Sequence, residues 1–407
     1  MIDVIRQRFM AMPAAWRRAI VAGLALRLAA AIGAFAFAGL LVSAPPVDVE
    51  AVRGTSFEGW DAPHPEDQGV GLLGAGLERF DAGWYLAIAR SGYPDHDPDR
   101  EVPAAAAFFP LFPLLVGLVG RALGGMYLLG ANVVTLVATI VGLAGVHRLV
   151  EVETGDDDLA RRSLIAIAVF PAAFFLVAPY TESLFLAVSV WALVAARRGR
   201  FWRATLLAVA AGLTRNVGVL LALPLALEAL RQVRERRPGP WLPRVAAVVG
   251  APAGLGLYLG YAQLHMGRWD APKLAQQGWE RDFAWPTEAI AGAVQIGTAT
   301  PGLYPSGYHS VDLVIGGAVI AGVLWLLARA PLPYALYGLA HVVVWLVYPF
   351  PGRPLMSTYR FALAIAPLGW AFGAWTRRPS VAAAWYAASG AMMGVLLLLF
   401  VTWYFVF

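Results

Sequence analysis

The sequence predicts an all-α polytopic membrane protein with about eleven spanning helices in one domain, and three observations carry this prediction. Hydrophobic residues make up 59% of the chain and charged residues only 14%, which is more apolar surface than a soluble core of this length needs. Apolar runs of about twenty residues recur along the chain, the length at which a helix crosses a bilayer. These runs do not alternate in polarity as the strands of a membrane barrel would.

Two long hydrophilic connections, 44–103 and 265–310, interrupt the apolar runs. The first run is too long for the apolar part of a signal peptide, so we expect an uncleaved anchor. The chain has no Cys, which excludes structural disulfides. We see no internal repeat and no soluble domain, so residues 1–407 are expected to form a single unit. The apolar runs are 19–42, 104–123, 127–147, 163–178, 182–196, 204–213, 217–230, 245–264, 311–328, 332–349, 359–375 and 381–405.

The distribution of arginines predicts the orientation of the chain in the membrane. Four arginines precede residue 19, which places the N-terminus in the cytoplasm. If 104–123 crossed the membrane, the basic clusters 197–203 and 231–244 would both lie outside, against the same rule. We therefore interpret 104–123 as an interfacial or re-entrant helix within a first outer loop, 44–125. The C-terminus is then expected outside.

This orientation collects the unusual charged residues near the outer face. Ionisable groups at membrane depth are costly and indicate function by default. The short runs on either side of Thr214, Arg215 and Asn216 are expected to line a water-filled cavity. Arginine forks match phosphate oxygens, so a negatively charged headgroup is the predicted ligand. The charged residues are Asp81, Glu182, Arg215, Lys273, Arg353 and Arg360.

Four segments resemble one known family in the same order along the chain. They are RFDAGWYLAIARSGY from residue 79, AFFPLFPLL from 107, PYTESLF from 179 and LTRNVGVLLALPLALE from 213, with a weaker echo in STYRF from 357. Together they resemble the GPI mannosyltransferase II (PIG-V) family and its bacterial relatives over most of 78–228. The chain departs from the family at Phe80, where Trp is usual, and in the last motif, which lacks a Pro and ends in Phe361.

The resemblance implies a GT-C glycosyltransferase. Such an enzyme moves a sugar, mannose in this family, from a polyprenyl-phosphate donor to a hydroxyl on the outer face of the membrane. The acceptor is a glycan, a glycolipid or a glycoprotein. No nucleic-acid partner is expected, because the arginines fall in short clusters between apolar runs.

The same motifs assign roles to residues. Asp81 matches the family's motif Asp, and helical spacing places it beside the aromatic side of its helix, so we expect an inverting reaction with Asp81 as general base. Glu182 is expected to help orient donor or acceptor, although it could merely cap the following helix. Arg215, with Arg360, is expected to hold the donor phosphate. The other predicted substrate-binding residues are Asn216, Tyr85, Trp84, Tyr180 and Lys273; the aromatic ones would also suit a membrane-interface belt.

The acidic loop residues Asp95, His96, Asp97 and Asp99 offer oxygen ligands for a divalent metal, but such a loop is usually only solvated. We therefore expect no cofactor and do not favour a metal. Two other functions compete with the enzyme. A flippase or transporter for lipid-linked sugars would place ionisable residues inside several spans, and an assembly protein would need no acid and arginine cluster.

Overall fold

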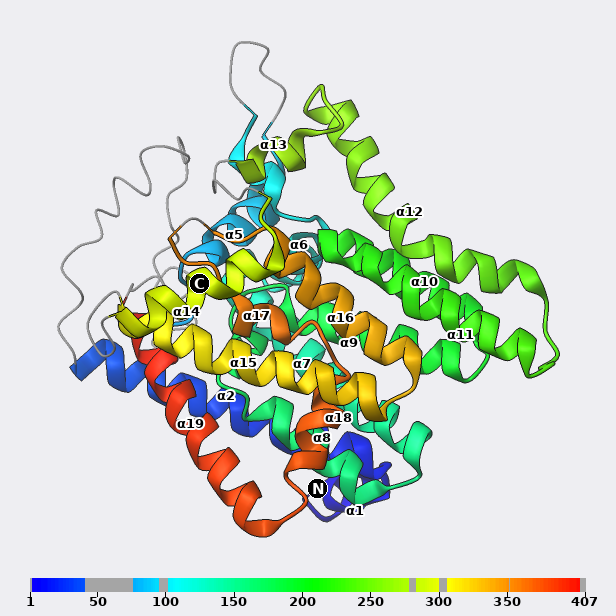
Figure 1. Ribbon diagram of the computed structural model, residues 1–407. Coiled ribbons are helices and arrows are strands. Elements are labelled where there is room, and N and C mark those ends of the chain that lie inside the picture. Colours follow the sequence, from blue (N-terminus) through cyan, green and yellow to red (C-terminus); the bar gives the residue numbers. More distant parts are fainter. Residues whose placement is uncertain are drawn as a thin grey trace.

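The computed structural model describes residues 2–40, 76–94, 102–277, 283–299, 306–350 and 352–402. These residues form helices and no strand, as predicted, and Figure 1 shows their arrangement. The helices are α1 (Ile2–Ala11), α2 (Ala14–Leu40), α5 (Asp81–Ser91), η2 (Ala104–Ala107), α6 (Leu111–Ala122), α7 (Tyr127–Thr154), α8 (Asp157–Ala168), η3 (Ala173–Leu176), α9 (Glu182–Arg197), α10 (Phe201–Thr214), η4 (Asn216–Leu221), α11 (Ala222–Arg234), α12 (Trp241–His265), α13 (Ala271–Gln277), α14 (Pro286–Ala299), α15 (Ser306–Arg329), α16 (Leu332–Val347), α17 (Thr358–Ala362), α18 (Leu368–Trp375) and α19 (Pro379–Val401).

Six helical stretches in the described part of the chain are long and apolar enough to cross a membrane. They are α2, α7, the η4–α11 unit, α12, α15 and α19, and three shorter apolar helices, α6, α10 and α16, accompany them. The chain is therefore a multi-pass membrane protein, while the number of eleven spans stays a prediction. α6 has 12 residues, so its length of about 18 Å falls well short of the bilayer core.

Two apolar runs that we predicted as continuous spans are broken. The prediction for 163–178 was wrong because α8 ends at Ala168 and the chain continues through Pro171 into the single turn η3. The prediction for 359–375 was wrong in the same way, with α17 and α18 separated by a turn before Pro367. Proline lacks an amide hydrogen and disfavours a helical residue before it, which hydropathy does not register.

The backbone carbonyls freed by the first break are bonded by side chains from neighbouring helices. Arg27 Nη1 donates to Val177 O at 2.5 Å, and Thr135 Oγ1 donates to the same carbonyl at 3.3 Å. Thr139 Oγ1 donates to Leu176 O at 2.5 Å. Irregular backbone at membrane depth is tolerated only when it is buried in protein and bonded in this way.

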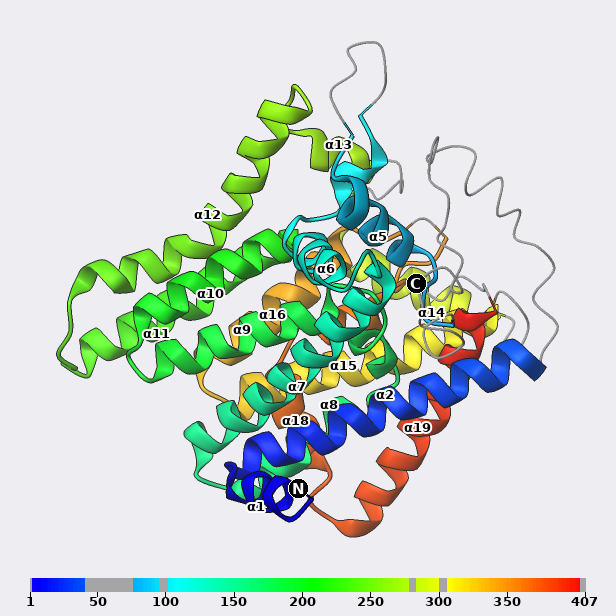
Figure 2. The ribbon, with the colours of Figure 1, turned by 180° about the vertical axis from the view of Figure 1, so that it is seen from behind.

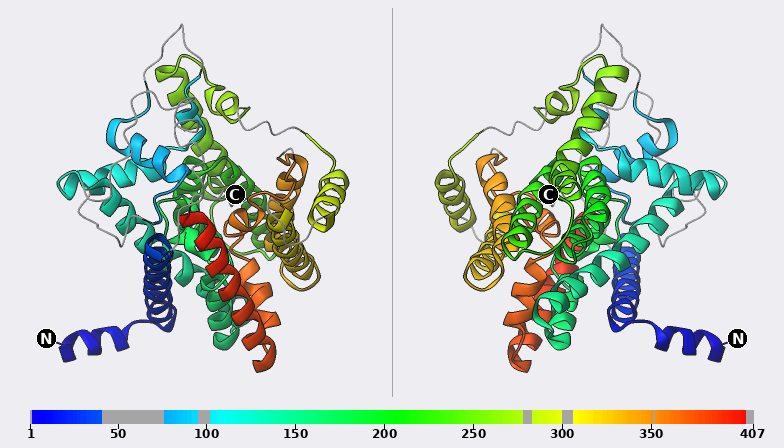
Figure 3. Two further views of the ribbon diagram at one scale, coloured as in Figure 1. Left: turned by 90° about the vertical axis from the view of Figure 1, so that its left-hand side faces the viewer. Right: turned by 90° about the vertical axis from the view of Figure 1, so that its right-hand side faces the viewer.

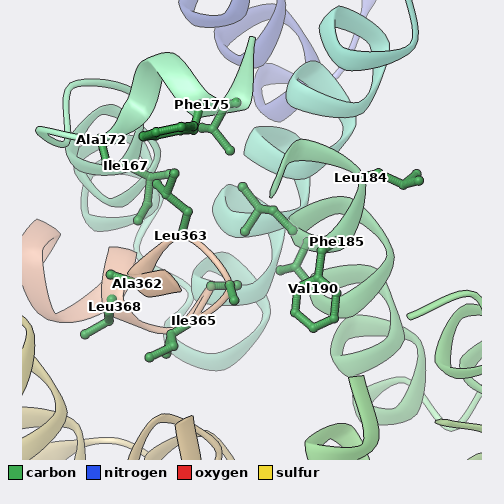
Figure 4. Packing of buried hydrophobic residues seen from close by; sticks show 14 of the residues in the cluster. Ile167, Ala172, Phe175, Leu184, Phe185, Val190, Ala362, Leu363, Ile365 and Leu368 are labelled. Carbon is green, nitrogen blue, oxygen red and sulfur yellow. The ribbon is translucent and has the colours of Figure 1, made fainter. Parts of the chain in front are cut away.

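The two broken segments pack against each other in the centre of the molecule. Figure 4 shows Ile167 and Phe175 from the first segment near Leu363 from the second, and all three side chains are buried. α8 and α18 lie close together, and Arg162 Nε donates to Gly373 O at 3.0 Å. The packed core thus holds in place the segment that precedes α9 and the segment that follows α17.

Helix α12 bends at its internal Pro252, and its second half reaches α13 and η2 (Figure 1). A proline inside a helix removes a hydrogen bond and clashes with the preceding turn, which accounts for the bend. Tyr258 Oη, beyond the bend, donates to Ala106 O at 2.7 Å. Figure 2 shows α5 and α6 beside this region, and the bend allows α13 to pack against η2.

The basic segments meet at one end of the molecule. Arg18 Nη1 lies 2.6 Å from Asp157 Oδ1, which joins the start of α2 to the start of α8. Glu153, Arg197, Glu228, Gln232 and Tyr334 form what we call the basic-end cluster: Arg197 Nε pairs with Glu153, Tyr334 Oη donates to Glu153 Oε1 at 2.7 Å, and Gln232 Nε2 donates to Glu228 Oε1 at 2.7 Å.

Helix α1 projects sideways from the start of α2 (Figure 3). The arginine-rich segments lie at one end of the molecule, which agrees with the distribution of arginines along the sequence. Which side of the membrane this basic end faces stays a prediction.

Candidate functional site

Four charged residues from four parts of the chain form an acid–arginine cluster. Arg360 Nη1 lies 2.8 Å from Asp81 Oδ2, and Arg360 Nε lies 2.5 Å from Glu182 Oε1. Arg215 Nη1 lies 2.6 Å from the same Glu182 oxygen. The structure thus brings together both predicted catalytic acids and both predicted phosphate-binding arginines.

Three members of the cluster stand at the end of a helix, and the fourth, Arg360, lies within a short one. Asp81 and Glu182 are the first residues of α5 and α9, where the positive end of the helix dipole stabilises a carboxylate. Arg215 is extended, with φ −155° and ψ 150°, between α10 and η4. Arg360 lies in α17, a short helix of five residues.

Two positive-φ residues that are not glycine lead into this cluster. Phe80, with φ 53°, directly precedes Asp81, and Ser357, with φ 68°, directly precedes α17. Such conformations cost energy and persist where the surrounding structure enforces them, which is frequent at functional sites. They direct the chain so that Asp81, the first residue of α5, lies against Arg360 of α17.

The two acids differ in exposure. The Glu182 side chain is 1% exposed and that of Asp81 is 23% exposed. Glu182 Oε1 accepts from both arginines, and Thr181 Oγ1 accepts a further bond from Arg215 at 3.1 Å. Among the described residues Glu182 Oε2 has no hydrogen-bond partner. Glu182 is therefore placed to hold the two guanidinium groups, whereas Asp81 is the acid that an incoming molecule can reach.

Aromatic rings support both arginines. The Arg360 guanidinium lies 4.8 Å from the centre of the Tyr180 ring, and that of Arg215 lies 5.4 Å from the Phe361 ring. A cation over the face of a ring is attracted by the electrons of the ring. Tyr180 is itself fixed, because its Oη donates to Arg79 O at 2.7 Å.

A cavity of about 700 Å³ opens beside the cluster. It is bounded partly by apolar residues of α16 and of the segment behind α17, including Val344, Trp345 and Ala364. A volume of this size accommodates a small organic ligand. Six of the predicted site residues line it: Asp81, Tyr85, Arg215, Asn216, Lys273 and Arg360.

The remaining three predicted residues are not among those that line the cavity. Glu182 and Tyr180 lie behind the arginines, as described above. Trp84 stacks on Phe108 at 5.4 Å between ring centres and so supports the cavity wall indirectly. Tyr85, which lines the cavity, packs edge-on against Phe108 and Phe112, each at 5.2 Å.

Asp312 and His341 are two further ionisable residues in this region, and neither was predicted. Arg353 donates to both oxygens of Asp312, at 2.5 and 2.9 Å, and this buried pair holds the loop that precedes Arg360. His341 lines the cavity; its Nδ1 lies 3.0 Å from Tyr337 O, and its Nε2 has no partner among the described residues. Asp312 and His341 each interrupt an apolar run, and this signal would have revealed them from the sequence.

The described part of the chain contains no group of three or more His, Cys, Asp and Glu side chains arranged to hold a metal ion. The residues considered for a metal, Asp95, His96, Asp97 and Asp99, lie outside the described residues.

No protein-family model matches the chain. GPI alpha-1,6-mannosyltransferase 2 of Mus musculus is 34% identical over 158 residues, which are 36% of this chain and 30% of the mouse protein. The protein of the same name from Rattus norvegicus is 35% identical over 175 residues, which are 38% of this chain and 33% of the rat protein. The matched part thus spans only about a third of these curated relatives.

Among solved structures, the archaeal oligosaccharyltransferase AglB from Archaeoglobus fulgidus, in complex with an inhibitory peptide and a dolichol-phosphate, aligns with a TM-score of 0.42 and 13% identity. The alignment covers 92% of this chain and 55% of that one. The resemblance expected from the ordered motifs is confirmed by the sequence comparisons: this chain is similar to GPI alpha-1,6-mannosyltransferase 2.

Proposed function

We propose that this protein is a membrane glycosyltransferase of the GT-C type that moves a sugar from a polyprenyl-phosphate donor to an acceptor hydroxyl. One observation carries the proposal. A cluster of two acids and two arginines lies at the wall of a cavity of about 700 Å³ whose remaining lining is largely aromatic and aliphatic. A phosphate with a sugar on one side and a prenyl chain on the other needs both kinds of surface.

Arg215 and Arg360 are the proposed phosphate-binding residues. Each guanidinium lies against aromatic rings and already binds Glu182 through one or more of its nitrogens. A phosphate entering the cavity would accept from nitrogens that Glu182 does not use. The positive charge then stabilises the phosphate as it leaves the sugar, so no separate acid is required.

Asp81 is the proposed general base. It takes the proton of the acceptor hydroxyl while the hydroxyl oxygen forms a bond to C1 of the sugar. The bond between C1 and the phosphate oxygen breaks, and its electron pair leaves with the polyprenyl phosphate. Attack opposite the leaving group inverts the configuration at C1. Asp81 suits this role because it is the more exposed of the two acids and lines the cavity.

The contact between Asp81 and Arg360 links the donor to the base. At 2.8 Å this ion pair occupies one oxygen of the Asp81 carboxylate. A donor phosphate that draws Arg360 toward itself would weaken the pair and free this oxygen to accept the proton of the acceptor hydroxyl. The chemistry is thereby favoured when the donor is in place.

Glu182 is the proposed positioning residue, because one of its oxygens bonds both arginines. Lys273, Asn216 and Tyr85 are proposed to contact the sugar or the acceptor from the rest of the lining. The names of the sequence relatives favour mannose as the sugar. We further propose that the site faces the outer side of the membrane, with the N-terminus in the cytoplasm, and that the acceptor is a glycan, a glycolipid or a glycoprotein.

The test is turnover by the purified full-length protein in lipid vesicles that contain polyprenyl-phosphate mannose with a radiolabelled sugar. Membrane lipids and glycans of the host serve as acceptors. The expected result is label in a new glycoside together with free polyprenyl phosphate, both formed about 10²–10⁴-fold more slowly by Asp81→Asn. Movement of labelled donor between leaflets without any new glycoside would instead identify a transporter and overturn the proposal.

A further inference from the structure

A second cavity lies at the opposite end of α10 from the acid–arginine cluster. It has a volume of about 320 Å³, and Arg200, Arg203 and Arg244 line it together with Trp202. Thr214, at the other end of α10, lines the larger cavity. The 14 residues of α10 separate the two by about 20 Å, so the small cavity is no part of the site described above.

The three arginines that line this cavity have no carboxylate partner among the described residues. The nearby acids are already occupied: Arg231 Nε lies 3.3 Å from Glu228 Oε2, and Arg237 Nε lies 2.7 Å from Glu235 Oε2. Arg244 Nη2 donates to a backbone carbonyl at 2.9 Å, and its buried Nε has no partner in this part of the chain. The lining therefore carries positive charge that no described carboxylate neutralises.

The N-terminal ends of two helices add to the positive charge of this cavity. α10 and α12 both begin at the cavity, and neither of their N-cap residues, Arg200 and Pro240, provides a side-chain cap. The first amides of an uncapped helix lack internal acceptors and bear a partial positive charge. Anions bind readily at such ends, and arginine forks provide geometry that matches a phosphate.

Exposed apolar side chains continue from the cavity along both helices. On α10 Trp202 is 56% and Leu206 72% exposed. On α12 Trp241, Val245 and Val249 are 70%, 48% and 53% exposed, at the four-residue spacing that places them on one face. In a membrane protein these faces contact lipid chains, and the tryptophans suit the level of the headgroups.

We propose that this cavity binds the phosphate of an anionic phospholipid whose acyl chains lie along the exposed faces of α10 and α12. A soluble phosphate shares the headgroup chemistry but gains nothing from the apolar surface. The proposed phospholipid therefore lies in the leaflet at the basic end of the molecule. The polyprenyl donor is proposed to react at the opposite end.

The experiment measures binding of dioleoyl-phosphatidylglycerol to the full-length protein in mild detergent by native mass spectrometry, with dioleoyl-phosphatidylcholine as the neutral comparison. The test variant changes Arg200, Arg203 and Arg244 to Gln. The matched control changes Arg198, Arg234 and Arg236 to Gln, which removes the same charge at the same end without touching the lining. We expect the test variant to weaken phosphatidylglycerol binding at least about tenfold and the control less than about threefold.

Equal weakening by the two variants would overturn the proposal, because the arginines would then act only as general positive charge. Displacement of bound phosphatidylglycerol by inorganic phosphate at the same concentration would assign the cavity to a soluble anion and overturn the lipid. If the triple variant unfolds, Arg203→Gln replaces it, since this side chain is exposed and has no protein partner among the described residues. It should weaken binding about threefold to fivefold.

Discussion

The acid–arginine cluster and the basic-end cluster are both buried networks of glutamate and arginine, yet only one adjoins a large cavity. In the basic-end cluster, Glu153 and Glu228 are 3% and 5% exposed, and each is bonded by protein side chains. Glu153, Arg197 and Glu228 line neither of the two cavities described above. In the acid–arginine cluster, Asp81, Arg215 and Arg360 all line the larger cavity.

The difference teaches that burial of charge does not by itself identify a site. The basic-end cluster ties the ends of α7, α9, α11 and α16 together, and its charges are satisfied within the protein. In the acid–arginine cluster, Asp81 is accessible from the larger cavity, and both arginines line that cavity. Paired variants in the two clusters should therefore separate loss of chemistry from loss of stability.

The largest effect is expected for Asp81→Asn. The amide keeps the shape of the side chain but cannot take a proton, so turnover should fall by about 10²–10⁴-fold. The matched control is Asp157→Asn, which breaks the Arg18 ion pair at the basic end and should leave turnover within about twofold, since an exposed pair contributes little. Steady-state turnover at saturating donor is the measurement. If Asp81→Asn keeps more than a tenth of wild-type turnover, Asp81 is not the general base.

Glu182→Gln compared with Glu153→Gln tests the difference between the clusters most directly. Both changes remove a buried carboxylate that pairs with arginine and should destabilise the fold, by an amount that approaches about 3 kcal/mol. Only Glu182→Gln should also lower kcat, because it releases both phosphate-binding arginines. Thermal unfolding and kcat are measured on the same preparations. An equal loss of kcat in the two variants would mean that Glu182 acts through stability alone.

Arg215→Lys is expected to have the next largest effect. Lysine keeps the charge but loses the planar fork, so kcat/KM should fall about tenfold or more, the loss of one charged hydrogen bond. Arg197→Lys makes the same exchange in the basic-end cluster and should leave kcat/KM near that of the wild type. Kinetics over a range of donor concentrations distinguish the two, and wild-type values for Arg215→Lys would exclude it from the donor site.

A smaller effect is expected from the Asp312 and Arg353 pair, which holds the loop before Arg360. Asp312→Asn weakens this pair without touching the cavity lining, so KM for the donor should rise about threefold to tenfold with little change in kcat. Asp312→Glu keeps the charge and should restore part of the affinity. A fall in kcat with unchanged KM would show that the pair does more than position Arg360.

No loss of activity is expected from cysteines that report the two ends of the molecule. The chain has no Cys, so single replacements at exposed Trp269, near α13, and at Arg198, near the basic-end cluster, give clean signals. In intact cells an impermeant maleimide should label the first and not the second. Labelling of the second cysteine and not the first would show the opposite orientation in the membrane and place the cavity on the cytoplasmic side.

The sequence was sufficient for the helical class and for the residues that meet in the acid–arginine cluster. Asp81, Glu182, Arg215 and Arg360 could be predicted because each stands in a polar motif that interrupts apolar sequence. The breaks after Ala168 and before Pro367 were missed, because hydropathy measures transfer from water and carries no information on backbone geometry. Asp312 and His341 were missed because a single polar residue hardly changes the average of a long apolar run.

The broken segments of the core also bear on how the chain is made. The side-chain donors described above to carbonyls of these segments come earlier in the sequence: Arg27, Thr135 and Thr139 precede Leu176 and Val177, and Arg162 precedes Gly373. As the ribosome releases each segment, the groups that satisfy its backbone are therefore already in the bilayer. This order of synthesis shortens the time for which these carbonyls face lipid without a partner. A circular permutant that began after residue 140 would lose this protection for Leu176 and Val177, while Arg162 would still precede Gly373.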